Sequence, residues 1–68
     1  MSTSNLVYMA NQIGKFFVSE DRDTAVDGIA EHLRLFWDPR MRSEIVAHLR
    51  AGGEGLDPPV RAAVARLS

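Results

Sequence analysis

The side chains best suited to chemistry in this sequence are two histidines and a set of carboxylates. His48 follows Glu44 by four residues, a spacing that brings an imidazole and a carboxylate together on a helix, as an acid–base pair requires. This arrangement is far more often a surface contact than a catalytic dyad. His32 follows Glu31 directly, and adjacent helical residues do not face each other. Since a domain of 68 residues has little room for a closed pocket, we predict no catalytic residue.

The sequence also offers few residues that could bind a metal or a cofactor. The chain has no cysteine, which excludes disulfides, thiolate zinc sites, iron–sulfur clusters held by this chain and a cysteine nucleophile. Its two histidines lie far apart without an H-x-x-x-H pair, and no glycine-rich phosphate loop occurs. The sequence therefore predicts no metal ligand and no cofactor-binding residue.

The composition is that of a folded domain, and its short length calls for an additional source of stability. Hydrophobic residues make up 46% of the chain, and eight basic against nine acidic residues give a net charge of −1, which argues against a general nucleic-acid binder. No targeting signal is present and no apolar run approaches the roughly 20 residues that cross a bilayer, so we expect a cytoplasmic protein without membrane association.

On folding, so short a chain buries only about 60% of the surface that its unfolded form exposes. Without disulfides, a partner is the remaining source of stability.

Apolar residues recur at helical spacing in four segments. In the second segment, either Phe36 or Trp37 provides the last core position. No segment alternates with period two for long enough to form a strand. We predict an all-α fold, a small bundle of three to four short helices in one domain, residues 1–68. The predicted helices run roughly over residues 4–18, 22–37, 39–51 and 58–67.

Proline, glycine and aspartate mark the helix ends. Asp38 is expected to close the second helix and cap the third, with Pro39 in the first helical position, which makes a sharp corner between them. Gly52 and Gly53 terminate the third helix, and the glycine-rich stretch predicts a hinge through which the last helix could detach. Gly14, within the first helix, indicates either a backbone passing close by or a plain stability cost.

The chain carries more apolar side chains than a one-sided core needs. Leu35 falls opposite the apolar stripe of the second helix, and Tyr8 stands apart from the stripe of the first. Phe16 and Phe17 spread apolar surface round a wide arc of the first helix. Each residue alone is ordinary, but together they favour a partner surface.

Basic residues gather in the second half of the chain. Residues 1–33 hold two basic against five acidic residues, a net charge of −3, whereas residues 34–68 hold six arginines against four acids, a net charge of +2. The densest run, Arg34–Arg42, places three arginines and Trp37 around the Asp-Pro corner, and Trp and Arg are typical anchors of interfaces. Alternatively, Trp37 closes the core and the arginines are solvated. The predicted partner-interface residues are Phe16, Phe17, Arg34, Leu35, Trp37, Arg40 and Arg42.

Several short runs, spread over most of the chain, carry a family resemblance. They are Met9–Gly14 followed by Phe16-Phe17, Gly28–Arg34, Phe36–Arg42, His48-Leu49, Gly52-Gly53, Gly55-Leu56, Pro58 and Ala63-Val64. On these runs the sequence resembles the small delta subunit of NAD-dependent formate dehydrogenase. The run from Phe36 to Arg42, with the A-N-Q-I-G segment upstream, is uncommon enough to make the resemblance specific.

The resemblance implies an accessory subunit of a cytoplasmic complex that oxidises formate to carbon dioxide and reduces NAD. It implies that the bis-molybdopterin guanine dinucleotide cofactor with molybdenum or tungsten, the iron–sulfur clusters and FMN belong to larger alpha, beta and gamma subunits, and that this chain carries none of them. The partner expected on this basis is the large alpha subunit. The expected role is in stability of the complex or in cofactor insertion and retention.

Two other functions remain open at this point. An assembly chaperone for molybdenum cofactor insertion would use the same surface but be absent from the mature complex. A helix-turn-helix DNA-binding protein would read DNA with the third helix, with Arg40 and Arg42 at its N-terminal end. The acidic preceding helix and the Trp-Asp-Pro corner, in place of the usual turn of three or four residues, argue against DNA binding.

Overall fold

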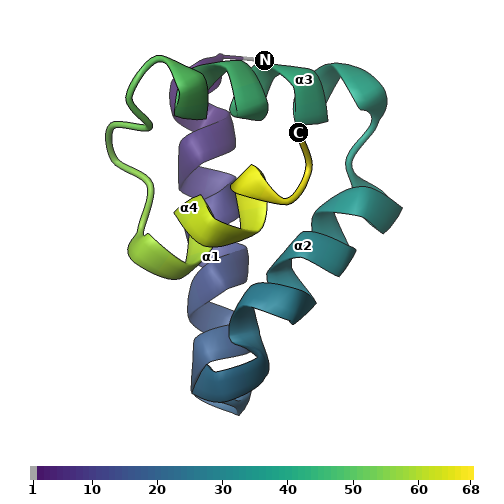
Figure 1. Cartoon of the computed structure of the whole chain (residues 1–68), viewed down its shortest axis with the longest axis vertical. Helices are drawn as coiled ribbons and strands as arrows, with labels where there is room; N and C mark the ends of the chain where they lie inside the picture. Colours follow the sequence, from purple (N-terminus) through teal and green to yellow (C-terminus); the bar gives the residue numbers. More distant parts are fainter. Residues whose placement is uncertain (1) are drawn as a thin grey trace.

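A computed structural model describes residues 2–68, and its regular structure is entirely helical. The elements are α1 (Thr3–Glu20), a short 3₁₀ turn η1 (Arg22–Thr24), α2 (Ala25–Phe36), α3 (Pro39–Arg50) and α4 (Pro58–Ala65). Figure 1 shows α1 and α2 meeting at η1, α3 lying across their other end, and α4 packed in front of α1. The prediction of an all-α bundle is confirmed.

The core lies where α4 meets the other three helices. Its buried side chains come from all four helices, the corner and the loop before α4, and they are Leu6, Ala10, Ala25, Ile29, Ala30, Leu33, Trp37, Ile45, Val46, Leu56, Val60, Ala63 and Val64. At Gly14 an added Cβ would lie 2.5 Å from the Cγ2 of Val60, so glycine here admits a side chain of α4. The close neighbour expected at Gly14 exists, but its nearest atoms belong to a side chain rather than to backbone.

The corner between α2 and α3 is held by a cap and by one arginine. Asp38 is the N-cap of α3, where its Oδ1 accepts a hydrogen bond of 2.9 Å from the Met41 amide, as the sequence predicts. Trp37 leaves the helix in an extended conformation (φ −88°, ψ 136°). The guanidinium of Arg42 donates to the carbonyl of Trp37, and at 3.2 Å to that of Arg34. These bonds satisfy carbonyls that the end of α2 would otherwise leave unpaired.

The end of α3 follows the predicted glycine stop. The amide of Gly53 donates to the carbonyl of His48 at 2.9 Å and that of Gly52 to the carbonyl of Leu49 at 3.0 Å, with φ of 64° and 124° at the two glycines. This is the Schellman pattern, in which glycine adopts the positive φ that other residues avoid.

The loop after α3 is fixed to the rest of the fold. The Asn11 side chain donates to the Gly55 carbonyl at 2.8 Å and accepts from the Asp57 amide at 3.0 Å, while Arg61 donates to the carbonyls of Gly52 and Gly53. Asp57 occupies the N-cap position of α4 without a side-chain cap bond. Together with the burial of Val60, Ala63 and Val64, these contacts make α4 an integral part of the core, in contrast to the detachable helix expected from the glycine-rich stretch.

Candidate protein–protein interface

Four ring side chains form a continuous row across α1 and α2. Phe16 and Phe17 meet edge to face with centroids 5.2 Å apart, Phe17 lies 6.0 Å from the ring of His32, and His32 lies 4.8 Å from Phe36. We call Phe16, Phe17, His32 and Phe36 the aromatic row. Its members are neighbours because Phe16 and Phe17 lie in the last turns of α1, and His32 and Phe36 are one turn apart on α2.

The ends of this row are exposed to solvent although they are large and apolar. Phe16 is 57% exposed and Phe36 is 71% exposed, and Leu35 beside Phe36 is 68% exposed. Single exposed apolar residues are normal. Here Phe16 and Phe36 are joined through the packed rings of Phe17 and His32, and Leu35 adjoins Phe36 in sequence. Exposed apolar residues grouped in this way are typical of an interaction site.

The corner decides which aromatic of α2 is buried. The helix ends at Phe36, whose side chain points outward, and Trp37 in its extended conformation is only 5% exposed within the core. Trp37 therefore closes the core, as in the alternative that the sequence left open, and its ring offers almost no surface to a partner. Phe36, which the sequence left as a core candidate, belongs to the surface.

A shallow apolar hollow adjoins the aromatic row. Gln12, Ile13, Phe16, Phe17 and His32 line a space of about 330 Å³ whose walls are almost entirely apolar. The ring of Phe17 stands directly over α2 at Gly28, where an added Cβ would lie 2.5 Å from its Cδ1. Glycine at this position thus lets the ring of Phe17 lie close against α2.

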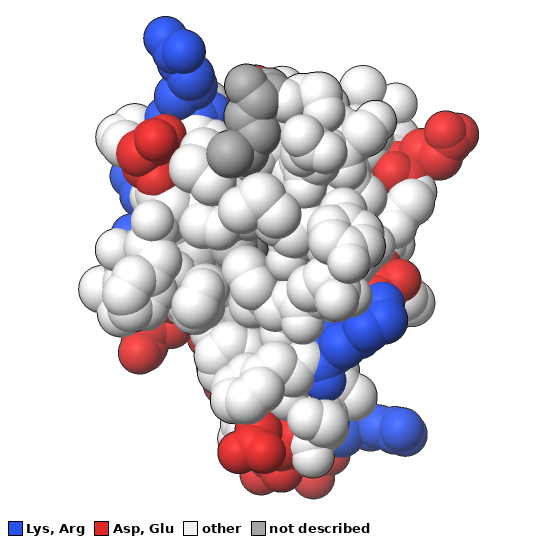
Figure 2. Space-filling view, turned by 180° about the vertical axis from the view of Figure 1, so that it is seen from behind, with Lys and Arg blue, Asp and Glu red and all other residues white. Residues whose placement is uncertain are grey.

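The face that α1 presents is poor in charge. Figure 2 views the molecule from the side on which α1 is nearest, and its centre is free of Lys, Arg, Asp and Glu side chains, which stand along the edges. A centre without charged side chains and a charged rim are typical of a protein–protein interface.

The three arginines predicted for the interface have different environments. Arg34 donates to the Arg66 carbonyl at 3.1 Å, and Arg42 binds the two carbonyls at the end of α2. Both therefore hold the fold together. Arg40 is exposed on α3, with no hydrogen bond or ion pair to residues 2–68.

The residues considered for acid–base chemistry do not act as a pair. Glu44 accepts a 2.8 Å hydrogen bond from Thr3, and the Nε2 of His48 lies 2.8 Å from the Glu54 carbonyl oxygen. Over residues 2–68, no three His, Asp or Glu side chains gather as metal ligands would. In the same part of the chain, no helix combines the length and apolar character needed to cross a membrane.

The comparison with known proteins decides the family. The family model of the NADH-dependent formate dehydrogenase delta subunit, FdsD, matches residues 5–64 of the 68. The chain belongs to the FdsD family. The matched range includes all four residues of the aromatic row and the Asp-Pro corner, so both lie within the part of the chain that the family model describes. Comparison with curated proteins and with solved structures gave no match.

Sequence reasoning missed two members of the interface candidate in this FdsD chain. His32 was considered for chemistry and Phe36 for the core, whereas both lie in the aromatic row. Their spacing of four residues was the available signal, since it places both side chains on one face of α2 next to the outward-facing Leu35.

Proposed function

We propose that this FdsD chain is a non-catalytic accessory subunit of a cytoplasmic NAD-dependent formate dehydrogenase, and that it binds the large cofactor-bearing alpha subunit. The proposed contact surface is centred on the aromatic row and includes the exposed residues Leu35 and Arg40. The observation that carries this proposal is the row of rings with its two exposed ends, Phe16 and Phe36, in a chain whose family is defined as a subunit of an enzyme.

The exposed rings supply apolar surface on the scale of binding hot spots. With about 200 Å² per phenylalanine side chain, Phe16 and Phe36 together leave roughly 250 Å² in water. At about 25 cal/mol per Å², covering this area contributes up to about 6 kcal/mol before the costs of association. Each ring therefore contributes on the scale of a binding hot spot, within a larger contact surface.

The proposed distribution of cofactors extends the family assignment, and the residues that the chain offers agree with it. It has no cysteine to hold an iron–sulfur cluster, and its described residues present no cluster of metal ligands. We place the molybdenum or tungsten cofactor, the iron–sulfur clusters, FMN and the NAD site in the alpha, beta and gamma subunits. This chain would stabilise the alpha subunit or help it to retain its cofactor.

Co-expression of the complex with and without this chain tests the proposed role. Measured on purified complex, the chain is expected at a fixed stoichiometry, and its omission should lower metal content, thermal stability or formate oxidation. Presence during assembly but absence from the mature complex would favour the chaperone instead. Equal stability, metal content and activity without the chain would contradict the supporting role.

Paired substitutions test the surface. Phe16→Ser combined with Phe36→Ser removes the two exposed rings and should weaken binding by about 3 kcal/mol, more than a hundredfold in Kd. Glu54→Ser, an exposed position on the loop before α4, is the matched control and should leave co-purification unchanged. Full retention of the doubly substituted chain, with its helical spectrum intact, would exclude the aromatic row as the contact.

A further inference from the structure

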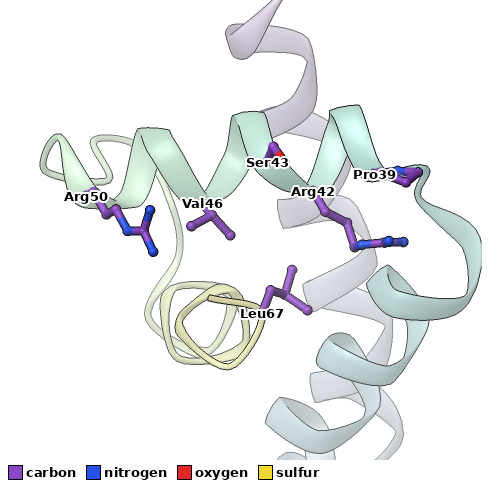
Figure 3. A pocket seen from close by; sticks show the side chains of 6 residues that line it. All are labelled: Pro39, Arg42, Ser43, Val46, Arg50 and Leu67. Atoms are coloured by element: carbon purple, nitrogen blue, oxygen red, sulfur yellow. The ribbon is translucent and has the colours of Figure 1, made fainter.

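A second surface, separate from the aromatic row, lies between α3 and the C-terminal turn. Its lining residues enclose a hollow of about 320 Å³ and are Pro39, Arg42, Ser43, Val46, Arg50 and Leu67. In Figure 3 the side chains of Val46 and Leu67 approach each other from α3 and from the turn after α4, and they form the middle of the hollow. The two arginines stand toward its two ends.

The charge on this hollow is of one sign. Arg50 is exposed and, within residues 2–68, has no ion-pair partner, and Arg42 donates only to neutral carbonyls. Near Arg42 and Arg50 in sequence lie Asp38, Glu44 and Glu54. Asp38 caps α3, Glu44 accepts a hydrogen bond from Thr3, and none of the three forms an ion pair with either arginine. The hollow therefore presents two arginines without an ion-pair partner in residues 2–68, with Val46 and Leu67 between them.

The spacing of the arginines defines what the hollow can bind. Arg42 and Arg50 are eight residues apart on α3, which at 1.5 Å per residue separates their Cα atoms by about 12 Å. In an extended chain, residues i and i+4 point to the same side and lie about 13 Å apart, with residue i+2 between them on that side. A segment with two carboxylates at i and i+4 and an aliphatic side chain at i+2 matches this surface.

We propose that the hollow between α3 and the C-terminal turn binds an extended segment of another protein chain with the pattern acidic-x-aliphatic-x-acidic. The aliphatic side chain packs on Val46 and Leu67. One carboxylate pairs with Arg50 and the other with the Nε and Nη2 of Arg42, whose Nη1 donates to the carbonyls of Arg34 and Trp37. Charge complementarity favours this occupant over a symmetric contact with a second copy of the chain, because that contact would bring the arginines of both copies to the same place. That the segment belongs to another subunit of the complex rests on the proposed function.

A peptide titration tests the hollow without the complex. The probe is an acetylated, amidated peptide Ser-Glu-Ser-Leu-Ser-Glu-Ser, added to the full 68-residue chain labelled with nitrogen-15. We expect saturable amide shifts at Val46, Arg50 and Leu67, with a Kd on the order of 1 mM for so short a segment. A peptide of the same composition with its two glutamates adjacent should bind more weakly.

Two charge reversals complete the test. Arg50→Glu should weaken binding about fivefold or more, the scale of one exposed ion pair, whereas Arg22→Glu makes the same change of net charge on η1 and should alter Kd by less than about twofold. Both positions are exposed, so a helical spectrum verifies that each variant folds. No saturable shift up to about 10 mM peptide, equal binding of the rearranged peptide, or equal effects of the two reversals would overturn the inference. None of these results bears on the aromatic row.

Discussion

The same substitution at two neighbouring aromatic residues of the corner should change the stability of the chain by very different amounts. Trp37 is buried in the core, whereas Phe36, one residue earlier, is 71% exposed. Replacing a buried tryptophan by alanine costs about 3–5 kcal/mol, because the transfer free energy is lost and a cavity remains. A surface replacement changes stability by less than about 0.5 kcal/mol.

In a chain of this size, the loss expected at Trp37 is a large part of the whole free energy of unfolding. Single domains are stable by about 0.05–0.15 kcal/mol per residue, so a chain of 68 residues has only about 3–10 kcal/mol to lose. Trp37→Ala should therefore remove most of the stability of the isolated chain, whereas Phe36→Ala should leave it folded. With a urea m-value of about 1 kcal/mol per M, the midpoint should fall by about 3 M for the first variant and by less than about 0.5 M for the second.

Urea unfolding followed by circular dichroism measures both midpoints. Trp37→Phe is the matched control, since it keeps a ring in the core and should lower the midpoint less than alanine does. Similar midpoint shifts for Trp37→Ala and Phe36→Ala would refute the assignment of one ring to the core and the other to the surface.

The remaining predictions concern α1 and its neighbours. Gly14→Ala should destabilise the chain although alanine favours helix, because the new Cβ meets Val60; a double-mutant cycle with Val60→Ala should show a compensating coupling of at least about 0.5 kcal/mol, and strictly additive effects would contradict the clash. Asn11→Ala removes both hydrogen bonds to the loop before α4 and should lower the melting temperature by about 5–10 °C and expose the Asp57 amide to hydrogen exchange. An unchanged melting curve and an equally protected amide would show that the loop is held by other contacts.

The helices and the Asp-Pro corner follow from local signals in the sequence. Helical periodicity, the cap at Asp38 and the glycine stop at Gly52-Gly53 each depend on residues within one or two turns, and the structure has all three. The exposed position of Leu35 follows from the 100° step of a helix in the same way.

The features that the sequence did not predict depend on contacts between distant residues. The glycine-rich stretch reads locally as a hinge, yet Asn11, more than forty residues earlier, fixes it to α1. The arginine run reads as a binding surface, yet Arg34 and Arg42 are used to satisfy carbonyls of α2 and of the C-terminal turn. Periodicity alone also does not separate Phe36 from Trp37, because the chain leaves its helical path between them.

Radical footprinting of the aromatic row tests the proposed interface most directly. Hydroxyl-radical oxidation of Phe16 and Phe36 would be quantified by mass spectrometry in the free chain and in the purified formate dehydrogenase complex. Since both rings are exposed in the free chain, burial against the alpha subunit should reduce their oxidation several-fold. Unchanged oxidation of both rings, in a complex that contains the chain at full stoichiometry, would contradict the proposed contact.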